Sequence, residues 1–158
     1  EATWSDFLTP AGVRNLAYGW DRIENVLWRV YHGELEGYDA DRVIVMIGTN
    51  NLHLNSNDEI LEGMNLIIEA IKIRQPIAKI TIVGILPRRE YESRIKLLNF
   101  QIAELTANHN LQYQDIGTKL LNNESSINES LFSDGLHPNK DGYLLLRDEM
   151  VRLCTPNE

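Results

Sequence analysis

The sequence predicts a three-layer α/β/α protein in which a parallel β-sheet is covered by helices on both faces. Short apolar segments of the kind that form buried strands alternate along the chain with longer segments of helical periodicity. Crossover connections of this kind are right-handed and place the strands parallel in one sheet. The alternation therefore predicts the α/β class.

Four segments are expected to form the strands. Residues 43–47 are apolar throughout and mostly β-branched, which is typical of a strand buried on both faces of a parallel sheet. Residues 79–86, with the sequence KITIVGIL, and the shorter segment 111–116 are expected to follow it. Residues 13–17 are an earlier, short candidate.

Two helices between these strands are marked by their spacing and by their ends. Apolar residues at positions 23, 26, 27 and 30 recur at i, i+3, i+4 and i+7, which predicts an amphipathic helix. A second helix is expected to begin after Ser56, because Glu59 completes a capping box with it. Pro76 forbids continuation, so this helix should end near Arg74.

Two further helices complete the predicted pattern. Residues 95–105 again carry apolar side chains at helical spacing, and a last helix is expected from about residue 141 to 153. Residues 117–133, which lie between the fourth strand and this helix, are rich in Asn, Ser and Glu. Their composition leaves open a flexible flap or a few extra turns.

Composition limits the classes of protein to which the chain can belong. We expect a single domain spanning 1–158, and 43% hydrophobic and 24% charged residues are ordinary for a soluble globular protein. No apolar run approaches the roughly 20 residues that cross a bilayer, so membrane insertion is not expected. The net charge of -8 would repel a phosphate backbone, which argues against nucleic acid as a partner.

Metal ions and disulfides are not indicated either. The lone Cys154 cannot form an internal disulfide, and the usual zinc patterns need more Cys and His than this chain has. The chain begins with Glu1 rather than Met, and we expect the domain to be incomplete at its N-terminus. The compartment stays open between the cytoplasm and export with a signal outside the sequence.

Candidate functional residues gather at one predicted edge of the sheet. In open parallel sheets, ligands bind where the carboxyl ends of the strands meet the following loops. Four segments are expected at that edge, after the four predicted strands in order: residues 18–21, 48–51, 87–89 and 134–137.

These segments contain the groups that ester hydrolysis through an acyl-enzyme requires, namely a base for a hydroxyl nucleophile and donors for the oxyanion. His137 is the expected base, and Asp134, three residues earlier, can fix the tautomer of its imidazole. Asn50 can offer its side-chain amide to the oxyanion, and the backbone N–H groups around Gly19 and Trp20 can offer a second donor.

Three side chains at the same edge are expected to contact the substrate: Asn51, Trp20 and Arg88. Trp20 offers a platform for a sugar or an acyl group. Arg88 can meet a polar or anionic group, although paired arginines after a strand are usually just part of a solvated loop.

The ordered set of motifs resembles the SGNH, or GDSL-type, hydrolase family over nearly the whole chain. Asn50 in IGTNN resembles the third block of that family, and Asp134 and His137 in SDGLHPN resemble its fifth. NVLWRVYHGEL, VIVMIGTNN and residues 74–88 are similar to the catalytic subunits of platelet-activating factor acetylhydrolase within the family. The resemblance implies a flavodoxin-like sheet, a Ser-His-Asp esterase that removes acetyl and other short acyl groups, and no cofactor.

The chain departs from the family pattern in three ways. The first strand and the nucleophilic serine that follows it should precede Asn15 by more residues than the sequence contains, and Ser5 follows no apolar strand, so both are expected upstream of residue 1. Trp20 stands where the family has glycine, with Gly19 one residue early, and its indole is expected to reshape or narrow the acyl pocket. Asn51 stands where many members have Asp, which removes a charge and leaves the expected oxyanion donor in place.

Two hypotheses from different classes remain. The first is a carboxylic ester hydrolase that acts on short-acyl esters of carbohydrates or small lipids, with a small-molecule ester as its partner. The second is a catalytically inactive relative that binds a glycan or a protein partner through the same edge, which the missing serine favours on its face. A truncated sequence explains the gap better, because loss of a central strand would expose apolar faces of its neighbours. The oligomeric state, a homo-oligomer included, is left open.

Overall fold

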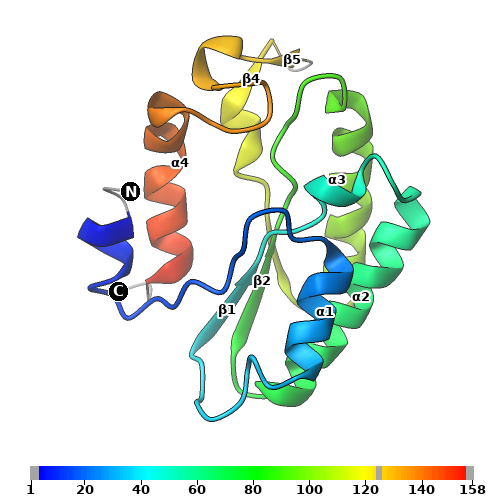
Figure 1. Ribbon diagram of the computed structural model, residues 1–158, viewed down its shortest axis with the longest axis vertical. Coiled ribbons are helices and arrows are strands. Elements are labelled where there is room, and N and C mark those ends of the chain that lie inside the picture. The colour runs from blue at the N-terminus through cyan, green and yellow to red at the C-terminus, as the bar shows by residue number, and fades with distance from the viewer. Residues whose placement is uncertain (1–3, 124–125, 156–158) are drawn as a thin grey trace.

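The fold is a parallel sheet between layers of helices, seen in a computed structural model that describes residues 4–123 and 126–155 (Figure 1). Three strands form the sheet in the order β1 (Arg42–Val45), β2 (Lys79–Val83) and β3 (Gln112–Gln114). Both neighbouring pairs run parallel. The predicted α/β class is therefore confirmed.

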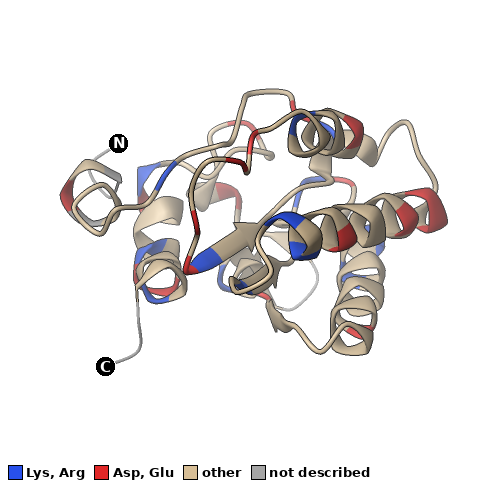
Figure 2. Cartoon of the chain, turned by 90° about the horizontal axis from the view of Figure 1, so that it is seen from below, with Lys and Arg blue, Asp and Glu red and all other residues tan. Residues whose placement is uncertain are grey.

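Helices cover the sheet on both faces, as Figure 2 shows from below. The α-helices of the described chain are α1 (Ile23–Tyr31), α2 (Asn57–Arg74), α3 (Glu92–Asn108) and α4 (Lys140–Cys154). Ile80 and Ile82 of β2 pack in one core cluster with α1, α2 and α3, whereas Val83 packs in a second cluster with Leu146 of α4. Successive strand side chains point to opposite faces, so a single strand supplies both clusters.

The ends of α2 lie where local sequence signals predict them. The Ser56 hydroxyl accepts the backbone N–H of Glu59 at 3.2 Å, and the Glu59 carboxylate accepts the N–H of Ser56 at 2.7 Å. The bond from the Ser56 backbone, followed by one from the Ser56 hydroxyl at 3.0 Å, lowers the pKa of the Glu59 carboxyl. The helix ends at Arg74, two residues before Pro76, as predicted.

The strand predictions for the first part of the chain are wrong in two respects. Residues 13–17 form no strand; instead the Asn15 side chain accepts the N–H of Ala17 at 2.9 Å in a local turn. Strand β1 ends at Val45, and it is not buried on both faces, because Arg42, Val43 and Ile44 are only partly buried. Met46, which the prediction included, lies after the strand and is 49% exposed. Among the described residues β1 pairs only with β2, so its second edge has no strand to cover it.

The described residues between β3 and α4 form turns, which favours the extra turns over the flexible flap. They comprise η3 (Gly117–Leu120), the two-stranded ribbon of β4 (Leu121–Asn122) and β5 (Ser126–Ile127), and η4 (Glu129–Leu131). Leu120 and Ile127 are buried in the same core cluster as α4, which anchors the ribbon. Near the N-terminus a π-helical turn, η1 (Trp4–Leu8), contacts α4.

Candidate active site

Asp134 and His137 form a hydrogen-bonded pair on the loop before α4. Nδ1 of His137 lies 2.8 Å from Oδ2 of Asp134, while Oδ1 accepts the backbone N–H groups of His137 at 2.7 Å and Leu136 at 2.9 Å. The backbone bond from His137 leads the causes that hold the pKa of Asp134 well below its ordinary value. An ionised carboxylate on Nδ1 keeps the proton of a neutral imidazole there and leaves the lone pair on Nε2.

The loop that carries this pair is closed at its base and tight at its tip. Phe132 and Pro138 form an isolated antiparallel bridge. Gly135 has a φ of +81°, in the left-handed region, and a Cβ there would lie 2.6 Å from Cζ of Arg89. The left-handed φ therefore favours glycine at this turn, and a side chain there would displace the exposed guanidinium of Arg89.

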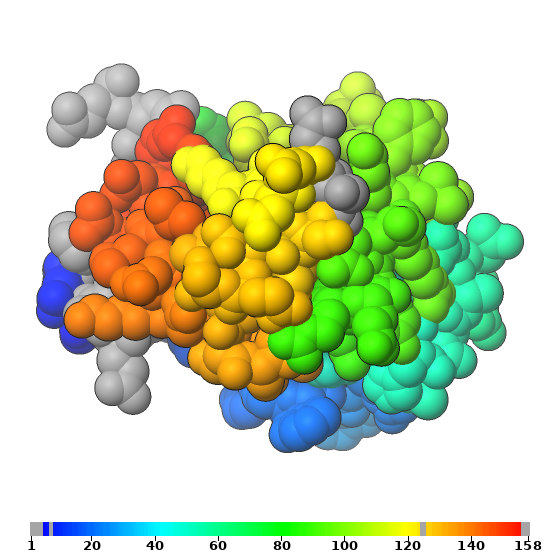
Figure 3. Space-filling view, turned by 90° about the horizontal axis from the view of Figure 1, so that it is seen from above, coloured from blue at the N-terminus to red at the C-terminus, as the bar shows by residue number. Residues whose placement is uncertain are grey.

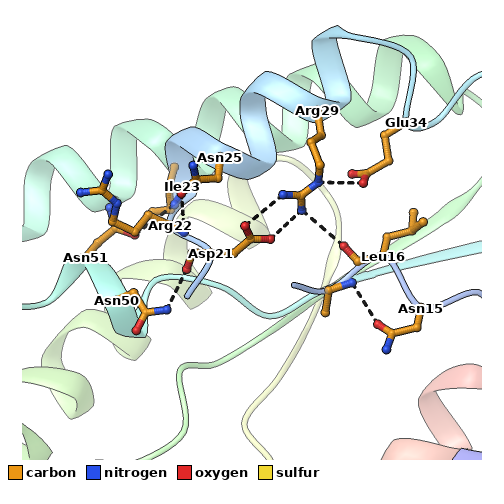
Figure 4. Close-up of polar contacts among 11 residues, drawn as sticks. Asn15, Leu16, Asp21, Arg22, Ile23, Asn25, Arg29, Glu34, Asn50 and Asn51 are labelled. Atoms are coloured by element: carbon orange, nitrogen blue, oxygen red, sulfur yellow. Dashed lines mark hydrogen bonds and ion pairs between the residues drawn. The ribbon is translucent and has the colours of Figure 1, made fainter. Parts of the chain in front are cut away.

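Asn50 lies in η2 (Thr49–Asn51), the short turn that follows β1. Gly48, with a φ of +117°, leads out of the strand, and a Cβ there would come within 3.0 Å of Ile85. Nδ2 of Asn50 donates to the backbone carbonyl of Asp21 at 2.9 Å, which joins this turn to the loop before α1 (Figure 4). An amide nitrogen carries two N–H groups, so the second remains for another acceptor.

Gly19 and Trp20 lie in the loop before α1. Trp20 has a φ of +67°, a left-handed conformation that strains an L side chain. This strain falls at the position where the resemblance in sequence expects glycine. The indole is 88% exposed, so among the described residues it fills no enclosed pocket. This exposure does not fit a narrowed acyl pocket, and a reshaped pocket stays a prediction.

The same loop is tied to α1 by an ion-pair network centred on Arg29 (Figure 4). Its guanidinium meets the Asp21 carboxylate through two bonds, Nη2 to Oδ2 at 2.7 Å and Nη1 to Oδ1 at 3.0 Å. Nε donates to Glu34 at 2.7 Å, and Nη2 also donates to the carbonyl of Leu16 at 3.3 Å. The bonds to Asp21 and Glu34, the one to Asp21 first, raise the pKa of Arg29. The centre of the Tyr18 ring lies 4.6 Å from Cζ of the guanidinium.

Arg88 and Arg89, which follow β2, connect two of the loops. Nη1 of Arg88 donates at 3.3 Å to the backbone carbonyl of Thr49, in the η2 turn that also carries Asn50. The backbone N–H of Arg89 donates to the carbonyl of Gly135, in the turn of the Asp–His pair, at 2.9 Å. Figure 3 views this edge from above, with the green segment after β2 against the orange segment that precedes α4. The structure thus brings the two loops to one edge of the sheet.

Asn51 is not placed to contact a substrate, and the expectation of such a contact does not fit the structure. Its side chain is 3% exposed. Oδ1 accepts the N–H of Ile23 at 3.0 Å, and Nδ2 donates to Glu24 at 3.1 Å and to Asn55 at 2.9 Å. Asn51 instead satisfies the first backbone N–H of α1 from a neighbouring loop (Figure 4).

Sequence reasoning missed two of the arginines that hold these loops, Arg94 and Arg29. Arg94 of α3 donates to the backbone carbonyls of Leu52 and Asn55 and to the side chain of Asn57, which fixes the chain between Asn50 and α2. No sequence signal marks Arg94, because two of its three partners are backbone carbonyls. Arg29 did have a signal, since it flanks the apolar stripe of its helix, where a long side chain can turn inward.

The described part of the chain shows neither a metal cluster nor a membrane span. In residues 4–123 and 126–155, no group of three or more His, Cys, Asp or Glu side chains is arranged to hold a metal ion. No helix of these residues combines the length and the apolar character needed to cross a bilayer.

Known proteins resemble the chain both in sequence and in fold. It is 31% identical over 158 residues to the alpha2 subunit of platelet-activating factor acetylhydrolase IB from Rattus norvegicus, covering 97% of this chain and 66% of that protein. A GDSL-like lipase from Bacteroides thetaiotaomicron superposes with a TM-score of 0.81 at 17% identity, covering 96% of this chain and 80% of the other. A carbohydrate esterase of family 3 from Talaromyces cellulolyticus gives a TM-score of 0.70 at 18% identity, covering 85% and 66%.

Family membership follows from the extent of the match in sequence. The GDSL-like Lipase/Acylhydrolase family matches residues 2–145, whereas the structural neighbours, at these identities, show the fold alone. The match confirms the resemblance that the Asn50 and His137 motifs predict. The chain therefore belongs to the GDSL-like lipase/acylhydrolase family.

Proposed function

We propose that the complete protein is a carboxylic ester hydrolase with a Ser-His-Asp triad, to which this chain contributes His137 and Asp134. The hydrogen bond of 2.8 Å between Nδ1 of His137 and Oδ2 of Asp134 carries the proposal. Membership of an acylhydrolase family supports the chemistry. The sequence contains no Gly-Asp-Ser after an apolar strand, so we propose that the nucleophilic serine lies upstream of residue 1.

In the proposed reaction the serine hydroxyl attacks the ester carbonyl while Nε2 of His137 takes its proton. Asp134 holds the Nδ1–H and stabilises the imidazolium that forms. The oxyanion meets the second N–H of Asn50 and a backbone N–H from Gly19 or Trp20. Collapse of the intermediate returns the proton from Nε2 to the leaving alcohol, and water then hydrolyses the acyl-serine by the same route.

Short-acyl esters of carbohydrates or small lipids are the proposed substrates. A relative is named as an acetylhydrolase subunit and a structural neighbour as a carbohydrate esterase. Trp20, 88% exposed beside the proposed oxyanion donors, supports this choice because an indole can stack on a sugar or pack on an acyl chain. Arg88 is bonded to Thr49 and lies 4.8 Å over the ring of Tyr91, so a substrate would meet its remaining N–H groups.

Turnover of p-nitrophenyl acetate by the complete protein tests the proposal. His137→Ala should lower kcat by about 10³-fold or more, because the members of a triad act as a unit. His109→Ala is the matched control: its imidazole bonds Asn65, 2.6 Å away, at the far end of α3, and this variant should keep wild-type activity. Equal rates for the wild type and His137→Ala would overturn the proposal, as would a wild type that does not exceed the buffer rate.

The alpha2 relative is named as a subunit, and we extend the proposal to a homo-oligomer of the complete protein. Light scattering on the purified protein checks this point, and a monomer mass at micromolar concentration would contradict it.

A further inference from the structure

We propose that Arg29 is a positioning residue that holds both oxyanion donors in place. Arg29 does not reach the reacting atoms itself; it acts through the loop before α1. The inference rests on the proposed function, because it assigns Arg29 a task in that reaction. It is carried by the bonds of one guanidinium to the two ends of a strained loop.

The Arg29 guanidinium bonds the loop before α1 at both of its ends. Nη2 bonds the carbonyl of Leu16 at 3.3 Å, and the fork of Nη1 and Nη2 holds the Asp21 carboxylate at 3.0 and 2.7 Å. Gly19 and Trp20, the proposed backbone donors, lie between these two anchors in the sequence. A bidentate fork fixes the direction of its partner as well as its distance, so the anchors set how the intervening backbone points.

The strain at Trp20 explains why such anchoring is needed. A tryptophan at a φ of +67° would relax toward a negative φ if the chain around it were free to move. Strained residues persist where the surrounding structure over-determines them, and they concentrate at functional sites. The indole, at 88% exposed, adds little packing of its own. Arg29 therefore supplies the restraint that the side chain of Trp20 does not.

The second donor depends on the same anchor. Asn50 is bonded at 2.9 Å to the backbone carbonyl of Asp21, the residue whose carboxylate Arg29 holds. A shift of Asp21 thus moves the partner of the amide as well as the backbone of Trp20. One guanidinium couples the two groups that are proposed to meet the oxyanion.

Burial makes the loss of this guanidinium more disruptive than the loss of one partner from an exposed ion pair. The side chains of Arg29, Asp21 and Glu34 are 18%, 14% and 13% exposed. Two carboxylates face one guanidinium, so removing its charge leaves two like charges close together in a poorly solvated place. Repulsion would then move the Asp21 and Glu34 carboxylates apart, and the loop before α1 would shift with Asp21.

The test compares three variants of the complete protein with the wild type. Arg29→Gln removes the charge and the fork, and Arg29→Lys keeps the charge but cannot bond Asp21, Leu16 and Glu34 together. Arg74→Gln is the matched control. Arg74 is the last residue of α2, where it stacks 4.6 Å over the ring of Tyr31 and donates to the backbone carbonyl of Ala70. Each variant is assayed for kcat and KM with p-nitrophenyl acetate and for hydrogen exchange in a peptide covering residues 15–22.

Arg29→Gln should lower kcat by at least about 10-fold, toward the roughly 10²- to 10³-fold of a lost oxyanion donor, while KM stays within about threefold. Arg29→Lys should lie between Arg29→Gln and the wild type, and exchange in residues 15–22 should rise in both. Arg74→Gln should leave kcat, KM and the exchange in residues 15–22 unchanged. Should Arg29→Gln fail to fold, the comparison of Arg29→Lys with Arg74→Gln decides the question.

Two results would overturn the inference while the proposed function stands: faster exchange with an unchanged kcat, or unchanged exchange in both Arg29 variants. Failure of the proposed function itself looks different, because the wild type would then equal His137→Ala. In that case Arg29 has no role in catalysis, and the exchange data still show whether Arg29 holds the loop before α1.

Discussion

Replacing Asn50 and Asn51 separately by alanine should separate catalysis from stability at adjacent positions. Asn51 is 3% exposed and accepts the N–H of Ile23 at 3.0 Å. Its loss leaves that buried N–H without a partner, which costs about 1–3 kcal/mol. We therefore expect Asn51→Ala to lose about 1–3 kcal/mol of unfolding free energy.

Asn50→Ala should have the opposite profile. Asn50 is only partly buried, and its side chain makes one hydrogen bond to the described residues, at 2.9 Å to the carbonyl of Asp21. Its removal should therefore cost about 1 kcal/mol of stability. As a proposed oxyanion donor it should cost about 10²- to 10³-fold in kcat. Urea unfolding followed by circular dichroism gives the first quantity, and p-nitrophenyl acetate turnover at a temperature where both variants are folded gives the second.

Asn55→Ala is the control for this pair, because it removes one partner of Asn51 at 2.9 Å and leaves the bond to Ile23 intact. It should be less destabilising than Asn51→Ala. The reasoning would be refuted if Asn50→Ala were the less stable of the two adjacent variants, or if a fully folded Asn51→Ala lost 100-fold or more in kcat.

Three further perturbations test the loops. Trp20→Gly should raise the unfolding free energy by up to about 1 kcal/mol, because relief of roughly 1–2 kcal/mol of strain at a φ of +67° exceeds the roughly 0.5–1 kcal/mol of extra glycine entropy. Gly135→Ala should lower the unfolding free energy by about 1–3 kcal/mol, because alanine is strained at a φ of +81°. It should also reduce kcat, because the new Cβ would lie 2.6 Å from Cζ of Arg89 and shift the turn that carries Asp134 and His137. Urea unfolding measures the first effect, and p-nitrophenyl acetate turnover measures the second. The pKa of Asp134 is lowered by folding, so the stability that its ionised form contributes should be complete above about pH 4, its unfolded pKa, and be lost as the pH falls toward the folded value. Urea midpoints of the wild type and Asp134→Asn should therefore converge below about pH 4.

Each of these expectations has an outcome that contradicts it. A less stable Trp20→Gly would show that the indole contributes more than its exposure suggests. A neutral Gly135→Ala would mean that the turn tolerates a side chain. A difference between the wild type and Asp134→Asn that grows with acid would reverse the assigned direction of the Asp134 pKa shift.

Signals that act within a few residues could be predicted from the sequence. The capping box of Ser56 and Glu59 and the break at Pro76 define the ends of α2, because each depends on groups on the same short segment. The Asp134–His137 pair is also local, since three residues of one loop are enough to bring the two side chains together. These predictions needed no knowledge of the rest of the molecule.

Signals that depend on a distant partner could not be predicted. Apolar residues at 13–17 suggested a strand, yet a strand exists only where another strand pairs with it, and here the segment is held by Arg29 from α1 instead. Asn50 and Asn51 are chemically identical neighbours, so the sequence does not predict which of the two side chains faces the candidate site at the carboxyl edge of the sheet. Only the packing of α1 against the η2 turn decides this, and it buries Asn51.

The sequence by itself determined the alternation of strands and helices, the family motifs and the pairing of the aspartate with the histidine. The tertiary structure decided which loops meet and which side chains hold them: Arg29 between Leu16 and Asp21, and Arg88 and Arg89 between the two motif loops. The physical reason is that periodicity and capping are set by neighbours along the chain. Ion pairs and buried hydrogen bonds are set by neighbours in space.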